Sequence, residues 1–558
     1  MNDPLIVNIA EALTDMARSR PHSLAVVCPS GRDRQGRARH THRTFQQLDR
    51  DSNAIARGLE GLGVSKGART ALMVKPSLEF FALTFALFKA GAVPVLIDPG
   101  IGVRNIGRCL ADAEPSAFIG TEKALAARAV LGWGRESIRV LVSVSKHRPR
   151  NGRTLDEVYE AGNFATPYTM ARVQPDDVAA ILFTSGSTGP PKGAVYTHAI
   201  FAAQVEILRA VYGIQPGEID LCTFPLFALF GPALGMTAII PEMDASRPAR
   251  VDPTKIIEAI EDFGVTNMFG SPALMRRVGF YGAEKNIKLP SLRRVISAGA
   301  PVPAKVVERF ATMLAPNVQL YTPYGATEAL PVASIGSDEL LLDTRRLTDL
   351  GHGVCVGRPV PGVRVEIIRT SDAPIPTWSD DLLVADGEVG EFVVRGPNVT
   401  REYFRLPDAT ALAKIQDPAT GGFFHRMGDL GYRDGKGRLW FCGRKAHRVQ
   451  IQGGTLYTIP SEAIFNTHPE VARSALVGIG IPGSMRPVLC VEPTKWSWLI
   501  GRKRLRRELL ALGATSPYTS AITTILFHPS FPVDIRHNSK IFREKLAAWA
   551  TRRLRRQP

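Results

Sequence analysis

The sequence predicts an α/β protein with more than one domain. Its 558 residues exceed what a single hydrophobic core ordinarily contains, so we expect two or more domains. Short apolar runs at residues 24–27, 70–74 and 92–97 have the length of buried strands, and helical patterns at 44–59 and 79–90 lie between them. Strands that alternate with helices are typical of parallel βαβ units.

The remaining elements extend this pattern along the chain. A helix is predicted at residues 9–17, whereas residues 31–43 are basic and without periodicity, so we expect a loop there. A further helix is predicted at 199–212, and strands that end in loops are predicted at 265–272 and 292–301. The α/β pattern therefore continues over most of the chain.

One uncharged segment, residues 221–240, is about long enough to span a bilayer. It contains Pro225, Gly231, Pro232 and Gly235, which interrupt a regular helix. We therefore expect this segment to be buried inside a soluble protein rather than in a membrane.

Composition indicates an ordinary globular protein. Hydrophobic residues make up 45% and charged residues 22%. The six cysteines lie far apart and form neither a CxxC pair nor a zinc spacing, so we expect reduced thiols in a cytosol. The first residues contain no basic region followed by an apolar one, so we predict no signal peptide and a cytoplasmic location.

The net charge of +17 is large, and much of the positive charge lies at residues 502–507 and 552–556. Three interpretations stay open: a solvated basic face, a surface for an acidic protein partner, and a surface for an anionic membrane. No nucleic-acid-binding motif accompanies these clusters, so we expect no nucleic acid.

A loop of hydroxyls and glycines follows an apolar strand at residues 178–182. Glycines allow the backbone to approach a ligand closely, and successive N–H groups in such a turn form a concavity that binds anions. A lysine ends the loop and adds a positive charge. The expected ligand is a polyphosphate, although the spacing differs from that of a P-loop. The residues concerned are Thr184, Ser185, Gly186, Ser187, Thr188, Gly189 and Lys192.

A second motif, Tyr324-Gly325-Ala326-Thr327-Glu328, supports the same chemistry. Together the loop and this motif resemble those of the adenylate-forming superfamily, which contains acyl-CoA synthetases, nonribosomal adenylation domains and luciferases. The resemblance implies that ATP and a carboxylic acid form an acyl-AMP and pyrophosphate. It also implies the adenylate-forming enzyme fold: a large α/β N-terminal adenylation domain at 1–443 and a small, mobile α+β C-terminal domain at 444–558.

The resemblance assigns roles to individual residues. The adenine would lie beside Gly299, Ala300, Tyr324 and Gly325, and the ribose beside Asp429 and Arg444. The α-phosphate would contact the hydroxyl of Thr327, and the carboxylate of Glu328 would bind Mg²⁺, which prefers few carboxylates plus phosphate oxygens. Lys192 and Lys540 would stabilise developing negative charge during adenylation.

The position of the acyl pocket in this superfamily is apolar here. Its predicted lining is Phe224, Phe227, Ala228, Phe230, Gly231 and Met236. An apolar wall suits an alkyl chain better than an amino acid. Ordinary core packing is the alternative explanation for the same residues.

The hinge block departs from the superfamily. Gly443-Arg444 is followed by Lys445, then by Ala446 and His447 in place of two aspartates, and Gln450 replaces a lysine. The usual transfer of the acyl group to CoA is therefore in doubt. An acid that carries its own β-hydroxyl would need no CoA, because that hydroxyl could attack the adenylate.

The sequence most resembles the β-lactone synthetases of bacterial long-chain olefin biosynthesis, on the basis of Pro190-Pro191, the 224–231 wall and the Arg-His-Asn-Ser-Lys segment at 536–540. This implies that ATP and a long-chain 2-alkyl-3-hydroxy acid give a β-lactone. One alternative is a fatty acyl ligase that forms acyl-CoA or loads an acidic carrier protein. Another is a non-catalytic adenylate-binding protein. The basic C-terminal region could also contact other enzymes of the same pathway.

Overall fold

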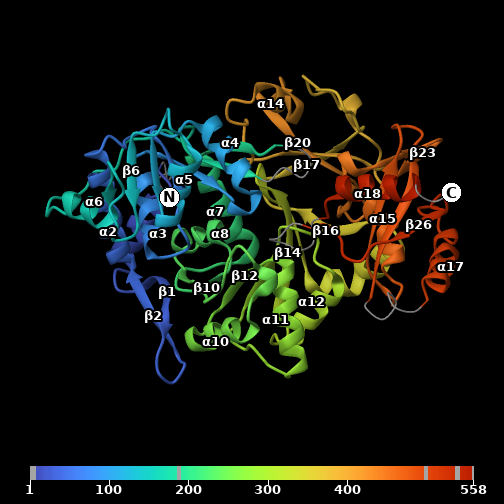
Figure 1. The fold of residues 1–558 in the computed structure, drawn as a ribbon, viewed down its shortest axis with the longest axis horizontal. Coiled ribbons are helices and arrows are strands. Elements are labelled where there is room, and N and C mark those ends of the chain that lie inside the picture. Colours follow the sequence, from blue (N-terminus) through green and yellow to red (C-terminus); the bar gives the residue numbers. More distant parts are fainter. Residues whose placement is uncertain (1–7, 185–189, 495–500, 534–540, 556–558) are drawn as a thin grey trace.

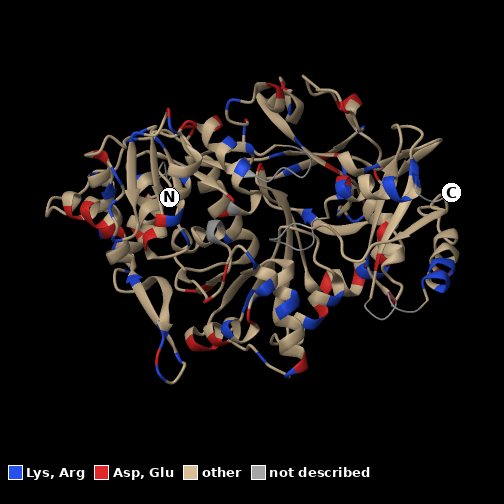
Figure 2. Ribbon diagram, in the orientation of Figure 1, with Lys and Arg blue, Asp and Glu red and all other residues tan. Residues whose placement is uncertain are grey.

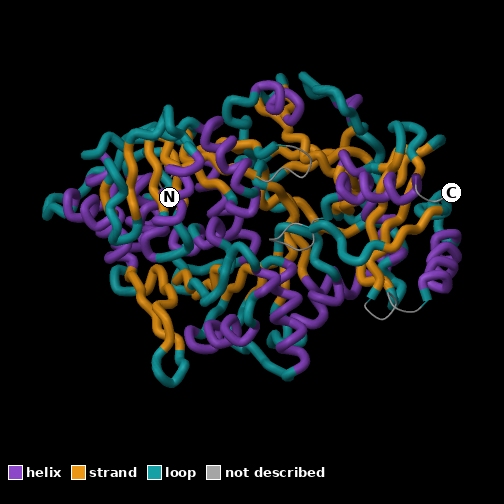
Figure 3. Tube along the Cα trace, viewed as in Figure 1, coloured by secondary structure: helices purple, strands orange, loops and turns teal. Residues whose placement is uncertain are grey.

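The computed structural model of the protein describes residues 8–184, 190–494, 501–533 and 541–555 (Figure 1). A large N-terminal α/β part is followed by a smaller C-terminal part with its own short sheets. This confirms the predicted fold class. Helices and strands intermix throughout the N-terminal part, whereas α15, α17 and α18 lie beside the C-terminal strands (Figure 3).

A seven-stranded sheet contains the predicted βαβ units. Six of its strands run parallel, in the spatial order β7, β6, β5, β3, β4 and β8, and β9 then returns antiparallel to β8. The prediction of parallel βαβ units is therefore confirmed. The strands are β3 (Arg69–Met73), β4 (Val93–Ile97), β5 (Ala117–Gly120), β6 (Val140–Ser143), β7 (Arg153–Thr154), β8 (Val178–Thr184) and β9 (Lys192–Thr197); the helices between them are α3 (Leu78–Lys89), α4 (Val103–Ala113), α5 (Glu122–Leu131) and α6 (Leu155–Gly162).

A second sheet has fourteen strands and continues toward the C-terminal part. Its parallel half includes β10 to β14, and its antiparallel half includes β15 to β21. The strands are β1 (Leu24–Arg32), β2 (Ala38–Thr44), β10 (Ile219–Cys222), β11 (Thr237–Ile239), β12 (Asn267–Gly270), β13 (Arg294–Ser297), β14 (Gln319–Ala326), β15 (Ala329–Gly336), β16 (Val354–Pro359), β17 (Arg364–Ile368), β18 (Gly390–Arg395), β19 (Lys414–Asp417), β20 (Gly422–Arg433) and β21 (Leu439–Arg444).

Further helices cover these sheets or connect their strands. They are α1 (Glu11–Ser19), α2 (Phe45–Glu60), α7 (His198–Tyr212), α8 (Pro225–Ala228), α9 (Phe230–Ala233), α10 (Pro253–Phe263), α11 (Pro272–Glu284), α12 (Ala304–Ala311), α13 (Arg345–Asp349) and α14 (Pro407–Ala413).

The last strand of the large sheet ends at Arg444, and the first strand after it, β22, begins at Val449. The C-terminal part contains β22 (Val449–Ile451), β23 (Gly454–Leu456), α15 (Thr458–Phe465), β24 (Val471–Ile479), β25 (Arg486–Pro493), α17 (Arg502–Ala514), β26 (Thr524–Phe527) and α18 (Arg543–Arg555). The domain boundary after residue 443 stays a prediction.

The predicted loop at residues 31–43 was wrong. Residues of β2 (Ala38–Thr44) pair antiparallel with β1 (Leu24–Arg32), with Val27 opposite His42 and Cys28 opposite Thr41. β2 is at the edge of its sheet, and edge strands commonly carry charged side chains. Backbone pairing with β1 therefore defines this strand, because its own residues lack the apolar alternation on which sequence recognition depends.

The uncharged segment at 221–240 is buried within the α/β part, as predicted. It is divided among β10, α8, α9 and β11, and Leu221, Ala228 and Ala238 are at most 1% exposed. Among the helices of the described ranges, none combines the length and the apolar character needed to cross a bilayer. All six cysteines are buried and free.

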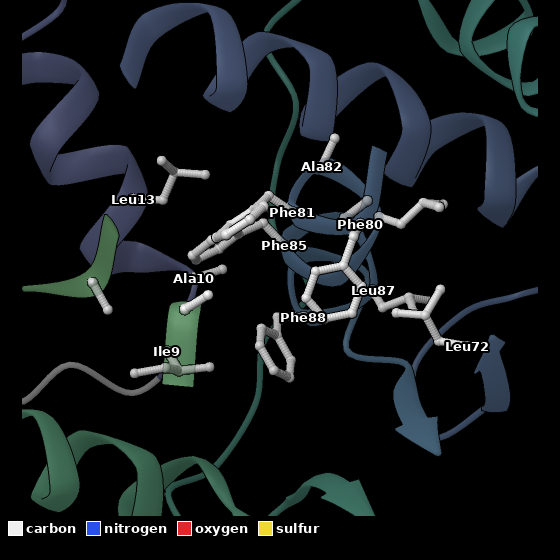
Figure 4. Close-up of a cluster of buried hydrophobic side chains, with 14 of the residues drawn as sticks. Ile9, Ala10, Leu13, Leu72, Phe80, Phe81, Ala82, Phe85, Leu87 and Phe88 are labelled. Carbon is white, nitrogen blue, oxygen red and sulfur yellow. The ribbon is translucent and has the colours of Figure 1, made fainter. Parts of the chain in front are cut away.

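Helix α3 is apolar on every side because it is buried on every side. Ser77 caps its start by accepting a hydrogen bond from the backbone N–H of Phe80. All of its residues from Phe80 to Lys89 are buried. The Lys89 ammonium is completely covered and lies 2.7 Å from the carboxylate of Asp49, which satisfies the charge. Figure 4 shows the side chains of Phe80, Phe85 and Phe88 on this helix.

His198 is the first residue of α7 and connects α7 to the N-terminal segment through a hydrogen bond. Its Nδ1 accepts a hydrogen bond of 3.3 Å from the backbone N–H of Ile9, a contact that requires an unprotonated nitrogen. Burial is the main reason why the pKa of His198 is lowered to about 4. The folded protein therefore holds this imidazole neutral.

The lowered pKa of His198 predicts a loss of stability in acid. The unfolded chain binds this proton near pH 6.5 and the folded chain only near pH 4, so the stabilisation is complete above pH 6.5 and is lost as the pH falls toward 4. When the pH falls from 7.5 to 4.5, we expect the free energy of unfolding of His198→Gln to decrease by about 2.5 kcal/mol less than that of the wild type. Thermal unfolding at both pH values measures this. His22→Gln, at an exposed histidine, is the control, and identical pH dependence of wild type and His198→Gln would contradict the prediction.

Candidate active site

The predicted phosphate loop leaves β8 and returns into β9. Thr184 ends β8, and its backbone is paired with that of Lys192 at the start of β9. Lys192 is half-buried, and its ammonium lies 4.9 Å from the centre of the Tyr403 ring. Ser185, Gly186, Ser187, Thr188 and Gly189 lie outside the described residues. Their roles stay predictions.

Thr327 and Glu328 form the tight turn between β14 and β15. The hydroxyl of Tyr403 donates a hydrogen bond of 2.7 Å to the Glu328 carboxylate. The hydroxyl of Tyr196 donates to the carbonyl of Thr327. These tyrosines fix the turn from two other parts of the fold, so the Glu328 carboxylate and the Thr327 backbone are held in place before any ligand binds.

The residues predicted beside the ribose are in contact with one another. Asp429 on β20 and Arg444 on β21 are paired in the sheet, and their side chains form an ion pair of 3.0 Å. The hydroxyl of Tyr324 donates to Asp429 at 2.6 Å. Asp429 is the main cause of a raised pKa at Arg444, so this guanidinium is a permanent cation. The structure thus places Tyr324, Asp429 and Arg444 together.

The residues predicted beside the adenine lie at two turns. Gly299 follows β13 and has a φ of 98°, a conformation that favours glycine. A Cβ at Gly325 would lie 2.6 Å from the carbonyl oxygen of Ala329, so the β14–β15 turn requires glycine there. Gly299 and Gly325 line a large central cavity of the protein. Ala300, although described, is not part of the lining of that cavity.

The predicted acyl pocket is lined by aromatic rings. Phe224, Phe227 and Phe230 line the cavity, and the rings of Phe227 and Phe269 are 4.5 Å apart between their centres. Ala228 and Met236 are at most 2% exposed and Gly231 is buried. Within the described residues these three support the wall from behind rather than line it.

One cavity of about 1540 Å³ connects these features. Its lining includes Lys192, Thr327, Glu328 and Arg444, which are predicted to bind the nucleotide, and the aromatic wall of α8 and α9. Ligand pockets for drug-sized molecules have volumes of about 300–1,000 Å³. The cavity is large enough for a nucleotide and a second, apolar ligand together.

The sequence did not reveal a group of buried charges next to the cavity. Glu391 and Arg426 are at most 2% exposed and form an ion pair of 2.6 Å, and Lys445 lies 3.0 Å from the same carboxylate. Burial lowers the pKa of Lys414 to about 7 despite the nearby Glu328. Burial also lowers the pKa of His425, with Lys414 adding to the effect. The only signal in the sequence is that charged residues occur within otherwise apolar strands.

The hinge segment is fixed to both parts of the chain. The ammonium of Lys445 donates to the carbonyl of Ser371 at 2.8 Å and contacts Glu391, while Arg448 contacts Asp372. His447 lies 3.1 Å from Glu544 of α18. Of the three replaced positions, His447 therefore makes a side-chain contact of its own, and its neighbours Lys445 and Arg448 make others.

Two predictions concern groups other than the residues above: the cation of Lys540 and a bound Mg²⁺. Lys540 lies outside the described residues, and its role stays a prediction. Within the described part of the chain, no three His, Cys, Asp or Glu side chains converge as a metal cluster. Mg²⁺ commonly takes one or two carboxylates and completes its shell with water and phosphate oxygens. A single carboxylate at Glu328, facing the cavity and held by Tyr403, fits this requirement.

These features define an enzyme that activates an acid with a nucleotide. The chain belongs to the AMP-binding enzyme family, whose model matches residues 13–404. It is therefore an AMP-forming ligase that uses ATP and an acid substrate. It is 50% identical over 549 residues to the olefin β-lactone synthetase of Xanthomonas campestris pv. campestris, with 98% of each chain covered.

Solved structures show the same fold. The amide bond synthetase McbA of Marinactinospora thermotolerans has a TM-score of 0.77 at 25% identity and covers 97% of this chain and 99% of its own. The o-succinylbenzoate coenzyme A synthetase MenE of Bacillus subtilis, solved with ATP and a magnesium ion, has a TM-score of 0.73 at 20% identity, covering 96% and 98%.

Proposed function

We propose that this enzyme converts a long-chain 2-alkyl-3-hydroxy fatty acid and ATP into a β-lactone, AMP and pyrophosphate, as a step in olefin hydrocarbon biosynthesis. The acid carboxylate first attacks the α-phosphorus, and pyrophosphate leaves. The 3-hydroxyl oxygen then attacks the acyl carbon. The bond between that carbon and the AMP oxygen breaks, AMP leaves with the electron pair, and the hydroxyl proton passes to water.

The observation that carries this proposal is the single cavity that joins charged and aromatic surfaces. An acid whose carboxylate lay near Thr327 could extend its hydrocarbon along Phe227 and Phe230, all of which line the same space. Holding the hydroxyl about 3–3.5 Å from the acyl carbon would offset much of the barrier to closing a four-membered ring.

Different residues would bind the nucleotide, hold the metal ion and stabilise charge in this reaction. Asp429 and Arg444 would bind the ribose, and Lys192 and Thr327 the phosphates. Glu328 would hold Mg²⁺, which neutralises phosphate charge when bound. Lys540 would supply a cation near the attacking carboxylate. The tyrosines at positions 196 and 403 hold the Thr327–Glu328 turn in place.

The test is product mass spectrometry after incubation with ATP, Mg²⁺ and a 2-alkyl-3-hydroxy acid, with and without CoA. We expect a product with the mass of the acid minus one water, formed at the same rate with and without CoA. The matched 2-alkyl acid without the hydroxyl should stop at the adenylate. A thioester product that depends on CoA would instead support an acyl ligase.

The acyl-ligase alternative has one supporting observation. Helix α17 presents Lys503, Arg506 and Arg507 on an exposed face (Figure 2), which would suit an acidic carrier protein. A product bound to a carrier protein, rather than a free lactone, would favour this alternative. The exposed bases would equally suit an anionic membrane surface or another enzyme of the same pathway.

A further inference from the structure

The apolar side of the cavity is lined from two different directions. One group of lining rings consists of Phe85 and Phe88 of α3 and Phe201 of α7. A second group consists of Phe224, which immediately precedes α8, and Phe269 of β12. The sequence predicted only the second of these walls, because α3 reads as an ordinary core helix.

Contacts between rings show where the two walls meet. Phe88 lies 6.5 Å from Phe85 and 5.8 Å from Phe201, measured between ring centres. Phe201 lies 6.5 Å from Phe230, and Phe230 lies 6.4 Å from Phe227. Phe230 is therefore the ring that joins the α3 wall to the α8 wall.

Parts of the cavity lining differ in their access to solvent. At the α3 end the lining residues Ile9, Leu72 and Phe85 are at most 5% exposed, and Figure 4 shows them within the packed aromatic core. Elsewhere the lining includes Lys75, in the loop before α3, and Asp244, which are both exposed. The Ser246 hydroxyl chiefly lowers the pKa of Asp244, and Lys75 adds to this effect. Lys75 and Asp244 are therefore close enough to interact where the cavity lining is exposed.

We infer that the cavity holds the two hydrocarbon chains of a branched acid in separate arms, a closed arm along α3 and an open arm toward Lys75 and Asp244. This inference rests on the proposed function for the branched substrate. The closed arm limits the length of one chain, because an additional methylene has no space within a close-packed core. The open arm tolerates length in the other chain, because that chain can extend to the surface.

The test uses acids in which one chain at a time is lengthened, at C2 or at C3. The readout is acid-dependent ATP–pyrophosphate exchange, which reports adenylation whether or not a ring closes. For the wild type we expect kcat/KM to fall roughly tenfold or more when the chain in the closed arm gains a methylene, and to stay within about twofold when the other chain does. Equal responses at both positions would overturn the inference.

Variants assign the selectivity to the closed arm. Phe88→Leu replaces a ring of the wall with a smaller side chain. For acids lengthened in the length-sensitive chain, this variant should raise kcat/KM roughly tenfold above the wild-type value, and it should not do so for acids lengthened in the other chain. The matched control is Phe81→Leu on the same helix, since Phe81 is fully buried but is not part of the cavity lining within the described residues. This control should lower stability without changing the ratio between chain lengths.

A second variant protects the test against simple misfolding. Phe201→Trp enlarges a partly exposed lining side chain, so it should fold and should shift selectivity toward shorter chains. If neither variant changes the ratio while both fold and adenylate, the arm along α3 does not hold substrate. β-Lactone formation is measured in parallel. If lactone forms but chain length has no effect, the two-arm inference is wrong and the proposed function stands. If adenylation is selective for chain length but no lactone forms, the proposed ring closure is wrong.

Discussion

Glu328→Gln should depress acid-dependent ATP–pyrophosphate exchange by roughly 10²-fold, the scale for removing one preorganised electrostatic stabiliser. The amide keeps the shape of the side chain and still accepts the hydrogen bond that Tyr403 donates at 2.7 Å. It loses the negative charge that would bind Mg²⁺. The effect should therefore fall on catalysis and not on folding.

Two further variants make this result specific. Glu284→Gln removes a carboxylate from an exposed position and should leave exchange unchanged. Tyr403→Phe removes the hydroxyl that positions Glu328, so it should give a smaller loss than Glu328→Gln. Wild-type exchange in folded Glu328→Gln would remove this carboxylate from the mechanism.

Glu391→Leu should be strongly destabilising, by about 3–5 kcal/mol. The substitution leaves Arg426 and Lys445 without their shared carboxylate, which lies 2.6 Å from the first and 3.0 Å from the second. Because Arg426 is only 2% exposed, its charge cannot be solvated by water. Thermal unfolding should show a fall in Tm on the order of 10 °C.

The double variant Glu391→Leu/Arg426→Leu should recover part of the stability lost in Glu391→Leu, because it removes the buried, unpaired guanidinium together with its carboxylate partner. Asp15→Leu is the control, since Asp15 and Arg18 form an ion pair with side chains that are 54% and 76% exposed. Exposed pairs contribute little. An equal Tm in the two single variants would show that burial does not determine the cost.

The local sequence was sufficient to predict the parallel sheet. Runs such as residues 71–74 and 178–182 are apolar throughout because both faces of a parallel sheet are covered, and this signal lies within a few consecutive residues. The edge strand β2 was missed because its pairing with β1 depends on a partner strand and not on its own side chains.

The motifs also predicted the residues for the nucleotide side of the site. Thr327 and Glu328 belong to one turn, so their spacing is fixed by the chain itself. The same applies to the loop between β8 and β9, whose glycines and hydroxyls are consecutive. A residue that reaches the site from elsewhere, such as Tyr196, carries no comparable signal, since it is one tyrosine in an otherwise ordinary strand.

The sequence by itself determined the α/β class, the AMP-forming chemistry and the residues of the local motifs, because each of these depends on neighbours in the chain. Only the tertiary structure decided that α3 lines the same cavity as α8, and that Glu391, Arg426 and Lys445 share one buried site. Burial and long-range contact are properties of packing. A phenylalanine in α3 has the same local sequence signature whether it faces another side chain or the space for a hydrocarbon chain.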